Sequence, residues 1–164
     1  MVILGIDPGI GRCGWGIVEV ENSKLKVQSF GCIETKPNSP IEQRLLVISS
    51  EIEKIIKKYK PDILAIEELF FGANSKTALI VGQARGVVLL MAGKANLPIS
   101  IYTPLQVKQA LTGYGRADKN QMGQMVKTIL GLEKIPKLDD TTDALAIAIT
   151  HVFSSKMRGI NDKK

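Results

Sequence analysis

The chain has 164 residues, of which 45% are hydrophobic and 23% are charged. This length and composition fit one compact domain with a full hydrophobic core, and they exclude a disordered chain. The two cysteines, Cys13 and Cys32, stand outside any CxxC motif or Cys/His cluster, which argues against a disulfide framework, a zinc finger or an iron-sulfur site. A reducing, cytoplasmic location fits this pattern best.

The net charge of +6 lies entirely in the second half of the chain. Residues 1–82 hold 10 basic and 10 acidic side chains, whereas residues 83–164 hold 12 basic and 6 acidic ones. Between Arg85 and Lys137 the balance is 8 to 2, which makes this region a candidate surface for a polyanion. Solvated helix faces explain the same excess equally well, so the charge alone does not decide.

No segment of the sequence is typical of a membrane protein. The apolar run from Met1 to Asp7 has no basic leader and ends in a carboxylate, which is typical of a strand and not of a signal peptide. The longest apolar stretches, such as Gly86–Gly93, are far shorter than the roughly 20 residues of a spanning helix. We therefore expect a soluble protein.

The first half of the chain predicts three antiparallel strands, then a helix and a fourth strand. Apolar runs, alternation and turn residues place the first three strands at Val2–Ile6, Trp15–Val20 and Leu25–Thr35. Apolar residues at steps of four and three predict an amphipathic helix between Ile41 and Tyr59. A short buried strand, Ile63–Ile66, follows the stop at Pro61.

The second half alternates helices with one more strand. Helices are expected at Ser75–Ala95, Pro104–Leu111, Asn120–Leu130 and Asp140–Phe153, and a strand at Ile99–Tyr102. The elements together predict an α/β fold with a mixed five-stranded sheet, in which parallel strands are added to three antiparallel ones and helices flank the sheet. We expect residues 1–156 to form a single domain and residues 157–164 to form a frayed C-terminal tail.

One glycine motif suggests a different function. Gly9, Gly11 and Gly14 spell G-x-G-x-x-G directly after the first strand, as in dinucleotide-binding proteins. That site needs a helix that opens at the glycines, whereas Trp15–Val20 alternates with the period of a strand. We therefore interpret the segment as a glycine-rich hairpin that leaves the Asp7 carboxylate open to solvent.

Acidic residues form a stronger pattern. Asp7 ends the first strand, Glu67 and Glu68 end the fourth, and Asp140 and Asp143 lie three residues apart at the start of the last helix. Neighbouring strand ends meet at one edge of an α/β sheet, and the helical spacing puts both aspartates on one face. Four carboxylates that meet there with no Arg or His nearby would repel each other, so the pattern predicts a divalent cation.

The oxygen-only ligand set favours Mg²⁺ over zinc, with Mn²⁺ as a possible substitute. Two such ions about 4 Å apart can activate a water molecule and stabilise the leaving oxygen in phosphodiester cleavage. Helix capping is a simpler role for Asp139, Asp140 and Asp143, and it is common. Capping is less favoured as the full explanation, because the same pattern of acids also includes Asp7 and Glu67.

Four segments in order carry a resemblance to a known family: Gly5–Gly9, Ala65–Phe70, Gly82–Gly86 and Asp140–Ala148. From Met1 to about Phe153, the sequence resembles the RuvC family of Holliday-junction resolvases. The resemblance implies an RNase H-like fold, a homodimer, and a metal-dependent endonuclease that nicks two opposed strands of a four-way DNA junction in recombination and repair. It also implies coupling to the branch-migration proteins RuvA and RuvB.

The resemblance assigns roles position by position. The implied catalytic and metal-binding residues are Asp7, Glu67, Asp140 and Asp143, with two Mg²⁺ ions per subunit. Lys108 and Lys119 match positions near the scissile strand, and Phe70 matches an aromatic residue that stacks on junction bases. Solvated lysines and a core phenylalanine are the simpler explanations. No catalytic role falls to Glu68, Asp139 or His151, and we interpret His151 as structural.

Two other functions were weighed against this one. The actin-like and sugar-kinase ATPases also begin with an Asp-x-Gly strand turn, but they need two such domains and 164 residues supply one. A basic module could instead bind junction DNA without cutting it, its acidic residues only capping helices. The apolar helix Ser75–Ala95, including Ile80, Val88 and Leu90, is the candidate dimer surface, although burial in its own core explains it nearly as well.

Overall fold

The computed structural model of the chain describes residues 1–22, 24–69 and 75–161. In chain order its elements are β1 (Val2–Asp7), β2 (Arg12–Glu21), β3 (Lys24–Glu34), α1 (Ile41–Tyr59), β4 (Ile63–Glu67), α2 (Ser75–Lys94), β5 (Ile99–Tyr102), α3 (Pro104–Thr112), α4 (Lys119–Leu130) and α5 (Asp139–Asn161). The strands form one sheet in the order β3-β2-β1-β4-β5. β1 to β3 are antiparallel, and β4 and β5 are added parallel to β1. The mixed, RNase H-like sheet is therefore confirmed.

Two segment boundaries bear on the predictions from sequence. β2 begins at Arg12, within the glycine motif, and pairs with β1 up to Gly14. No helix opens at these glycines, so the hairpin interpretation is confirmed and the dinucleotide site is excluded. At the other end of the chain, α5 continues past Phe153 to Asn161, so residues 157–161, which were expected in the tail, are helical.

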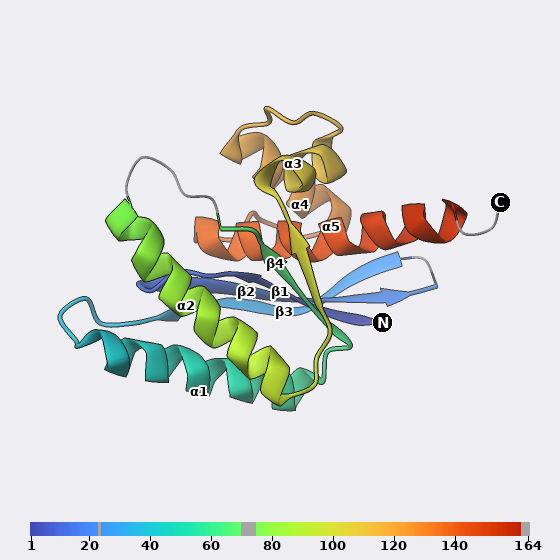
Figure 1. Ribbon diagram of the computed structural model, residues 1–164. Helices are drawn as coiled ribbons and strands as arrows, with labels where there is room; N and C mark the ends of the chain where they lie inside the picture. The colour runs from blue at the N-terminus through green and yellow to red at the C-terminus, as the bar shows by residue number, and fades with distance from the viewer. Residues whose placement is uncertain (23, 70–74, 162–164) are drawn as a thin grey trace.

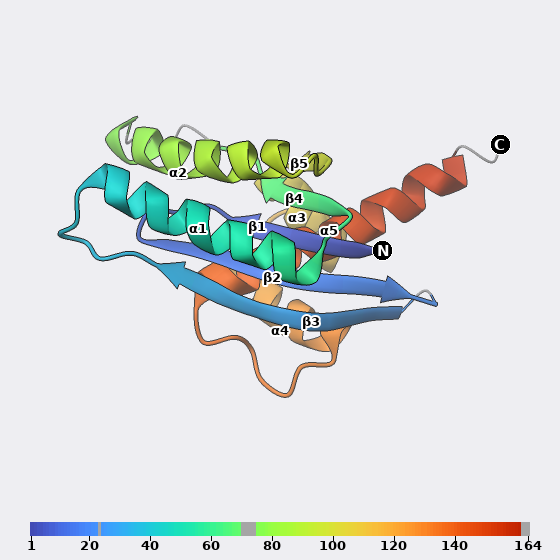
Figure 2. The same ribbon diagram turned by 90° about the horizontal axis from the view of Figure 1, so that it is seen from below.

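The sheet separates two layers of helices. α1 and α2 lie side by side on one face, and α5 crosses the other face with α3 and α4 packed against it (Figure 1). In the view from below, α1 runs along the sheet in front of β1 and β2 (Figure 2). Each layer has its own apolar core, one built around α5 and the other between the sheet and the α1–α2 pair. The sheet is thus buried on both faces, as is typical of α/β folds.

Strand alternation decides which side chains meet α5. Successive residues of a strand point to opposite faces. In β1, Leu4 and Ile6 belong to the core under α1 and α2, whereas Ile3 belongs to the core around α5. Gly5 and Asp7 share the face of Ile3. The carboxylate that ends β1 therefore points toward α5.

Two glycines allow α5 to lie close against the sheet. A Cβ atom at Gly5 would overlap the carbonyl oxygen of Ala144, and one at Gly14 would overlap the carbonyl oxygen of Asp140. Any larger residue at either position would push the helix away from β1 and β2. The sequence motif that resembles a nucleotide loop therefore includes a residue that sets the distance between sheet and helix.

No helix within the described ranges combines the length and the apolar character needed to cross a bilayer.

Candidate active site

Two of the predicted carboxylates lie at the ends of neighbouring parallel strands. β1 and β4 pair in parallel with Ile6 opposite Ile66, so Asp7 and Glu67 follow side by side at the same edge of the sheet. Both side chains alternate onto the face that α5 covers. Backbone register thus brings together two acids that are sixty residues apart in the sequence.

The other two predicted carboxylates come from the first turns of α5. Asp140 lies where this helix passes Gly14, near the start of β2, and Asp143 follows three residues later on the same helix. The Thr141 hydroxyl donates a hydrogen bond of 3.2 Å to the carbonyl oxygen of Gly31, which attaches the same turn to β3. A helix N-terminus favours negative charge, so this position stabilises the acids that the site collects.

The pKa values show that these acids repel each other. The pKa of Asp7 is raised from 3.8 to about 7, first by burial and then by the charges of Asp143, Glu67 and Asp140, while Lys119 opposes the shift. The pKa values of Glu67 and Asp143 are also raised, in each case first by burial. Each of these shifts also includes repulsion from another acid near the site. All four predicted acids therefore face a common space, which a cation would make more favourable.

The donor set fits a hard divalent cation. The carboxylates offer oxygen ligands alone, which Mg²⁺ and Mn²⁺ prefer. The Oδ2 atom of Asp140 is buried and accepts no well-directed hydrogen bond in the described part of the chain. Within the same residues, no three acidic, His or Cys side chains stand close enough to hold a metal ion as they are. A bound cation would have to supply the attraction that overcomes their repulsion.

Both predicted lysines border this space. Lys108 on α3 and Lys119 at the start of α4 line a cavity of about 360 Å³ together with Glu67 and Asp143. Lys108 lowers the pKa of Glu67, although burial and Asp143 dominate the net upward shift. The Lys119 ammonium donates to Asp139 Oδ2 at 3.2 Å, and this contact raises the pKa of Lys119. The lysines are thus placed to meet an anion that enters the cavity.

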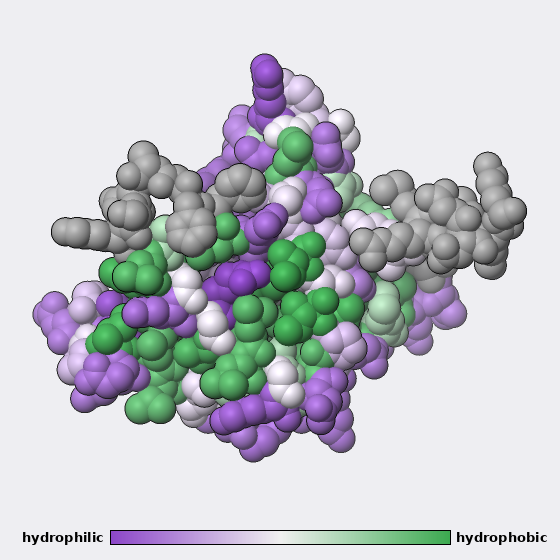
Figure 3. Space-filling view, in the orientation of Figure 1, coloured by the Kyte–Doolittle hydropathy of each residue, from purple (hydrophilic) through white to green (hydrophobic). Residues whose placement is uncertain are grey.

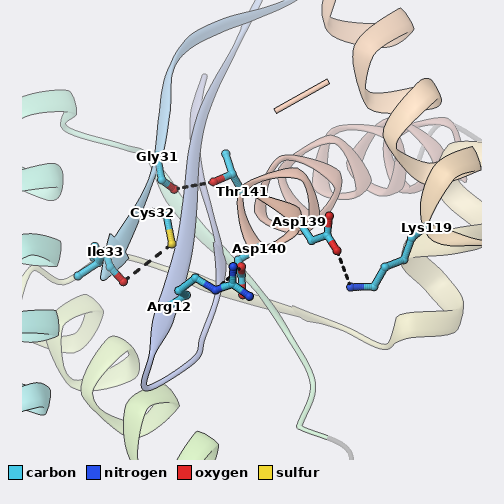
Figure 4. Close-up of polar contacts among 8 residues, drawn as sticks. All are labelled: Arg12, Gly31, Cys32, Ile33, Lys119, Asp139, Asp140 and Thr141. Atoms are coloured by element: carbon cyan, nitrogen blue, oxygen red, sulfur yellow. Dashed lines mark hydrogen bonds and ion pairs between the residues drawn. The ribbon is translucent and has the colours of Figure 1, made fainter. Parts of the chain in front are cut away.

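One prediction about the surroundings of the acids is wrong. The sequence analysis expected no arginine near them, but Arg12 Nε lies 3.2 Å from Asp140 Oδ2. In Figure 4 the arginine reaches Asp140 from β2, while Lys119 reaches Asp139 from the opposite side. The arginine's place in the glycine-rich hairpin, five residues after Asp7, was the available signal.

Four other residues that the sequence analysis named are Arg85, Glu68, His151 and Phe70. Arg85 on α2 donates to the main-chain oxygen of Glu67 at 3.4 Å and so supports the end of β4. Glu68 is exposed, and its backbone N–H donates to Tyr102 O, so the structure gives its carboxylate no place among the four acids. His151 is buried and its ring nitrogen lies 2.8 Å from the Tyr102 hydroxyl, in keeping with a structural role. Phe70 lies outside the described residues.

The chain is similar to known proteins over nearly its whole length. The family described as "Crossover junction endodeoxyribonuclease RuvC" matches residues 3–151. A relative of that name from Desulfitobacterium hafniense is 54% identical over 154 residues, covering 94% of this chain and 93% of its own. The structure of Thermus thermophilus RuvC superposes with a TM-score of 0.89 at 40% identity, covering 96% of this chain and 97% of that one.

A second structure of the Thermus thermophilus protein was determined with DNA. Described as RuvC in complex with Holliday junction substrate, it superposes with a TM-score of 0.88 at 38% identity and covers 96% of both chains. The match therefore extends over the whole sheet, both helix layers and the edge where the acids meet. The chain belongs to the RuvC family.

Proposed function

We propose that the protein is a structure-selective endonuclease that resolves four-way DNA junctions in recombination and repair, by paired nicks that depend on a divalent metal ion. The observation that carries this proposal is the convergence of Asp7, Glu67, Asp140 and Asp143 on one space, with raised pKa values at three of them. The names of the related proteins, and a relative's complex with junction DNA, support the choice of substrate.

In this proposal the four carboxylates hold Mg²⁺, two ions per subunit, and Mn²⁺ can replace it. Bound divalent ions supply activation of a water molecule and stabilisation of the leaving oxygen. The protein's own contribution is to position the acids: strand register places Asp7 and Glu67, and α5 places Asp140 and Asp143. The same acids repel the phosphate backbone when no cation is bound, which makes productive DNA approach depend on metal.

Lys108 and Lys119 bind the scissile strand in this proposal. Their positions around the cavity beside Glu67 and Asp143 support a contact with the phosphate that is cut. Negative charge builds on that phosphate in the transition state, so the lysines stabilise the transition state more than the bound substrate. The contact therefore raises the rate of cleavage more than the affinity for DNA. Stacking of Phe70 on junction bases stays a prediction from the family resemblance.

Two opposed nicks need two active sites, so the proposal includes a homodimer with two-fold symmetry. On α2 the side chains of Leu79, Ile80 and Leu90 are exposed to 66%, 39% and 57%, whereas Val88 is fully buried in the core. Ile101 of β5, exposed to 52%, adds to this surface. Figure 3 shows apolar side chains gathered over the face that α2 and β5 present. Exposed apolar side chains that gather on one face are typical of a protein–protein interaction surface.

The dimer is tested by sedimentation at micromolar concentration. Leu79→Glu places a charge in the proposed interface and should convert the dimer to monomer. Leu46→Glu introduces the same charge on α1, at a side chain exposed to 68%, and serves as the matched control. Monomeric wild-type protein, both alone and with junction DNA, would contradict the homodimer.

The binding module without catalysis is the second candidate, and the structure makes it less favourable. Helix capping can explain acids at the start of α5, but Asp7 and Glu67 end strands and cap no helix.

The proposal also includes action in the cytoplasm, which the free cysteines Cys13 and Cys32 support, and coupling to RuvA and RuvB.

Mapping of nicks on fixed and mobile four-way junctions, with Mg²⁺ or with EDTA, tests the function. The proposal expects Mg²⁺-dependent nicks at symmetric positions on two opposed strands and no cutting of a linear duplex of the same sequence. Junction binding without cleavage would favour the binding module. Equal cutting of the linear duplex would contradict structure selectivity.

A further inference from the structure

Arg12 is the cation in direct contact with a predicted metal ligand. Its Nε atom lies 3.2 Å from Asp140 Oδ2, and the two side chains are exposed to 52% and 22%. That oxygen is buried and accepts no well-directed hydrogen bond from any described residue. The guanidinium group is therefore the compensating partner that the structure provides for this carboxylate.

The other charged groups around Asp140 do not replace Arg12. Asp7 and Asp143 carry the same sign as Asp140 and repel it. The Lys119 ammonium interacts electrostatically with Asp140, but it donates its hydrogen bond to Asp139. Cys32 on β3 also faces Asp140, and burial together with that carboxylate raises the pKa of its thiol, so the thiol brings no compensating charge.

We infer that Arg12 is a positioning residue that acts through Asp140, holding this carboxylate in the metal-free protein until a divalent cation displaces it. The inference rests on the proposed metal-dependent function. Arg12 is half exposed, so its guanidinium can leave Asp140 for solvent without breaking the core. Exposed ion pairs are weak, and we therefore expect Arg12 to weaken metal binding about two- to fivefold rather than to prevent it.

The strength of this competition should depend on the contact and not on net charge alone. Arg12→Gln removes the contact and one positive charge. Lys24→Gln removes one positive charge at the opposite end of the β2–β3 pair, where Lys24 lies opposite Glu21. Arg12→Lys keeps the charge but loses the planar group. Comparison of the three variants thus distinguishes the effect of the ion pair on metal binding from the effect of net charge.

The test is calorimetric titration of the full chain with Mn²⁺ in the absence of DNA. We expect Arg12→Gln to lower the Kd for Mn²⁺ about two- to fivefold, Arg12→Lys to stay closer to wild type, and Lys24→Gln to leave the Kd unchanged. A structural role of Arg12 would weaken metal binding instead. An unchanged or higher Kd for Arg12→Gln, or an equal change in Lys24→Gln, would overturn the inference.

Failure of this inference can be told apart from failure of the proposed function. If wild-type protein binds Mn²⁺ and cuts junctions while Arg12→Gln has the wild-type Kd, the role of Arg12 alone is wrong. If neither protein binds Mn²⁺, both the inference and the metal-dependent function are wrong.

Discussion

Of the four acids, Asp7 should destabilise the folded, metal-free protein most when it is ionised. Its pKa is raised from 3.8 to about 7, first by burial and then by Asp143, Glu67 and Asp140. Because one pKa unit corresponds to about 1.4 kcal/mol, ionised Asp7 disfavours the folded state by on the order of 4 kcal/mol above pH 7. Asparagine has nearly the same shape and no charge. We expect Asp7→Asn to raise the free energy of unfolding by about 2 to 4 kcal/mol at pH 8 in EDTA.

This stabilisation should depend on pH. In the unfolded chain Asp7 ionises near 3.8, whereas in the folded protein it keeps its proton to about pH 7. The folded state therefore binds more protons between these values, and this group makes the wild-type protein less stable as the pH rises through that window. The difference between Asp7→Asn and wild type should be small at pH 4 and reach its full size above pH 7.

Urea unfolding of both proteins in EDTA, from pH 4 to pH 8, measures the effect. Glu68→Gln is the matched control, because this neighbouring carboxylate is exposed and its replacement should change stability by no more than about 0.5 kcal/mol. If Asp7→Asn is no more stable than wild type at pH 8, or if its gain is the same at every pH, burial and the neighbouring acids do not disfavour the Asp7 charge as described.

The remaining predictions concern packing and DNA. Gly14→Ala should destabilise the fold by about 1 to 3 kcal/mol or more in thermal unfolding, because its Cβ would overlap the Asp140 carbonyl oxygen. Gly86→Ala on α2, where a Cβ meets nothing within 4 Å, should instead be neutral or stabilise by about 0.5 to 1 kcal/mol; equal effects at both sites would refute close approach of α5. Lys119→Ala should lower the rate of junction cleavage more than the affinity for junction DNA, measured by single-turnover kinetics and by binding in Ca²⁺. A purely solvated Lys119 would leave both unchanged.

Local patterns in the sequence are enough to predict most of the elements. A continuous apolar run identifies β1, alternation identifies β2, and the apolar spacing of Ile48, Ile52 and Ile55 identifies the buried face of α1. Capping residues mark the helices of the second half: Thr103 and Gln106 form a capping box at α3, and Asp118 and Gln121 form one at α4. These signals depend on residues that are neighbours in the chain, so they can be recognised in a single sequence.

Contacts between distant segments could not be predicted in the same way. The acids of the site could be proposed because each stands at the end of an element, but the ion pair of Arg12 with Asp140 depends on how closely α5 crosses β2. That distance is set by Gly5 and Gly14, which the sequence placed only in a strand and in a glycine-rich hairpin. The partner of Lys119 was missed as well, since helix capping was the simpler explanation for Asp139 and no catalytic role fell to it.

Cleavage of a four-way junction by two adjacent carboxylate variants tests the central claim most directly. Glu67 faces the other acids from the end of β4, whereas Glu68 is exposed and outside the group. With Mg²⁺ present, Glu67→Gln should nearly abolish cleavage while junction binding and thermal stability survive, and Glu68→Gln should keep most of the activity. Near-normal cleavage by Glu67→Gln, or equal loss in both variants, would contradict a metal-dependent nuclease site built from these four carboxylates.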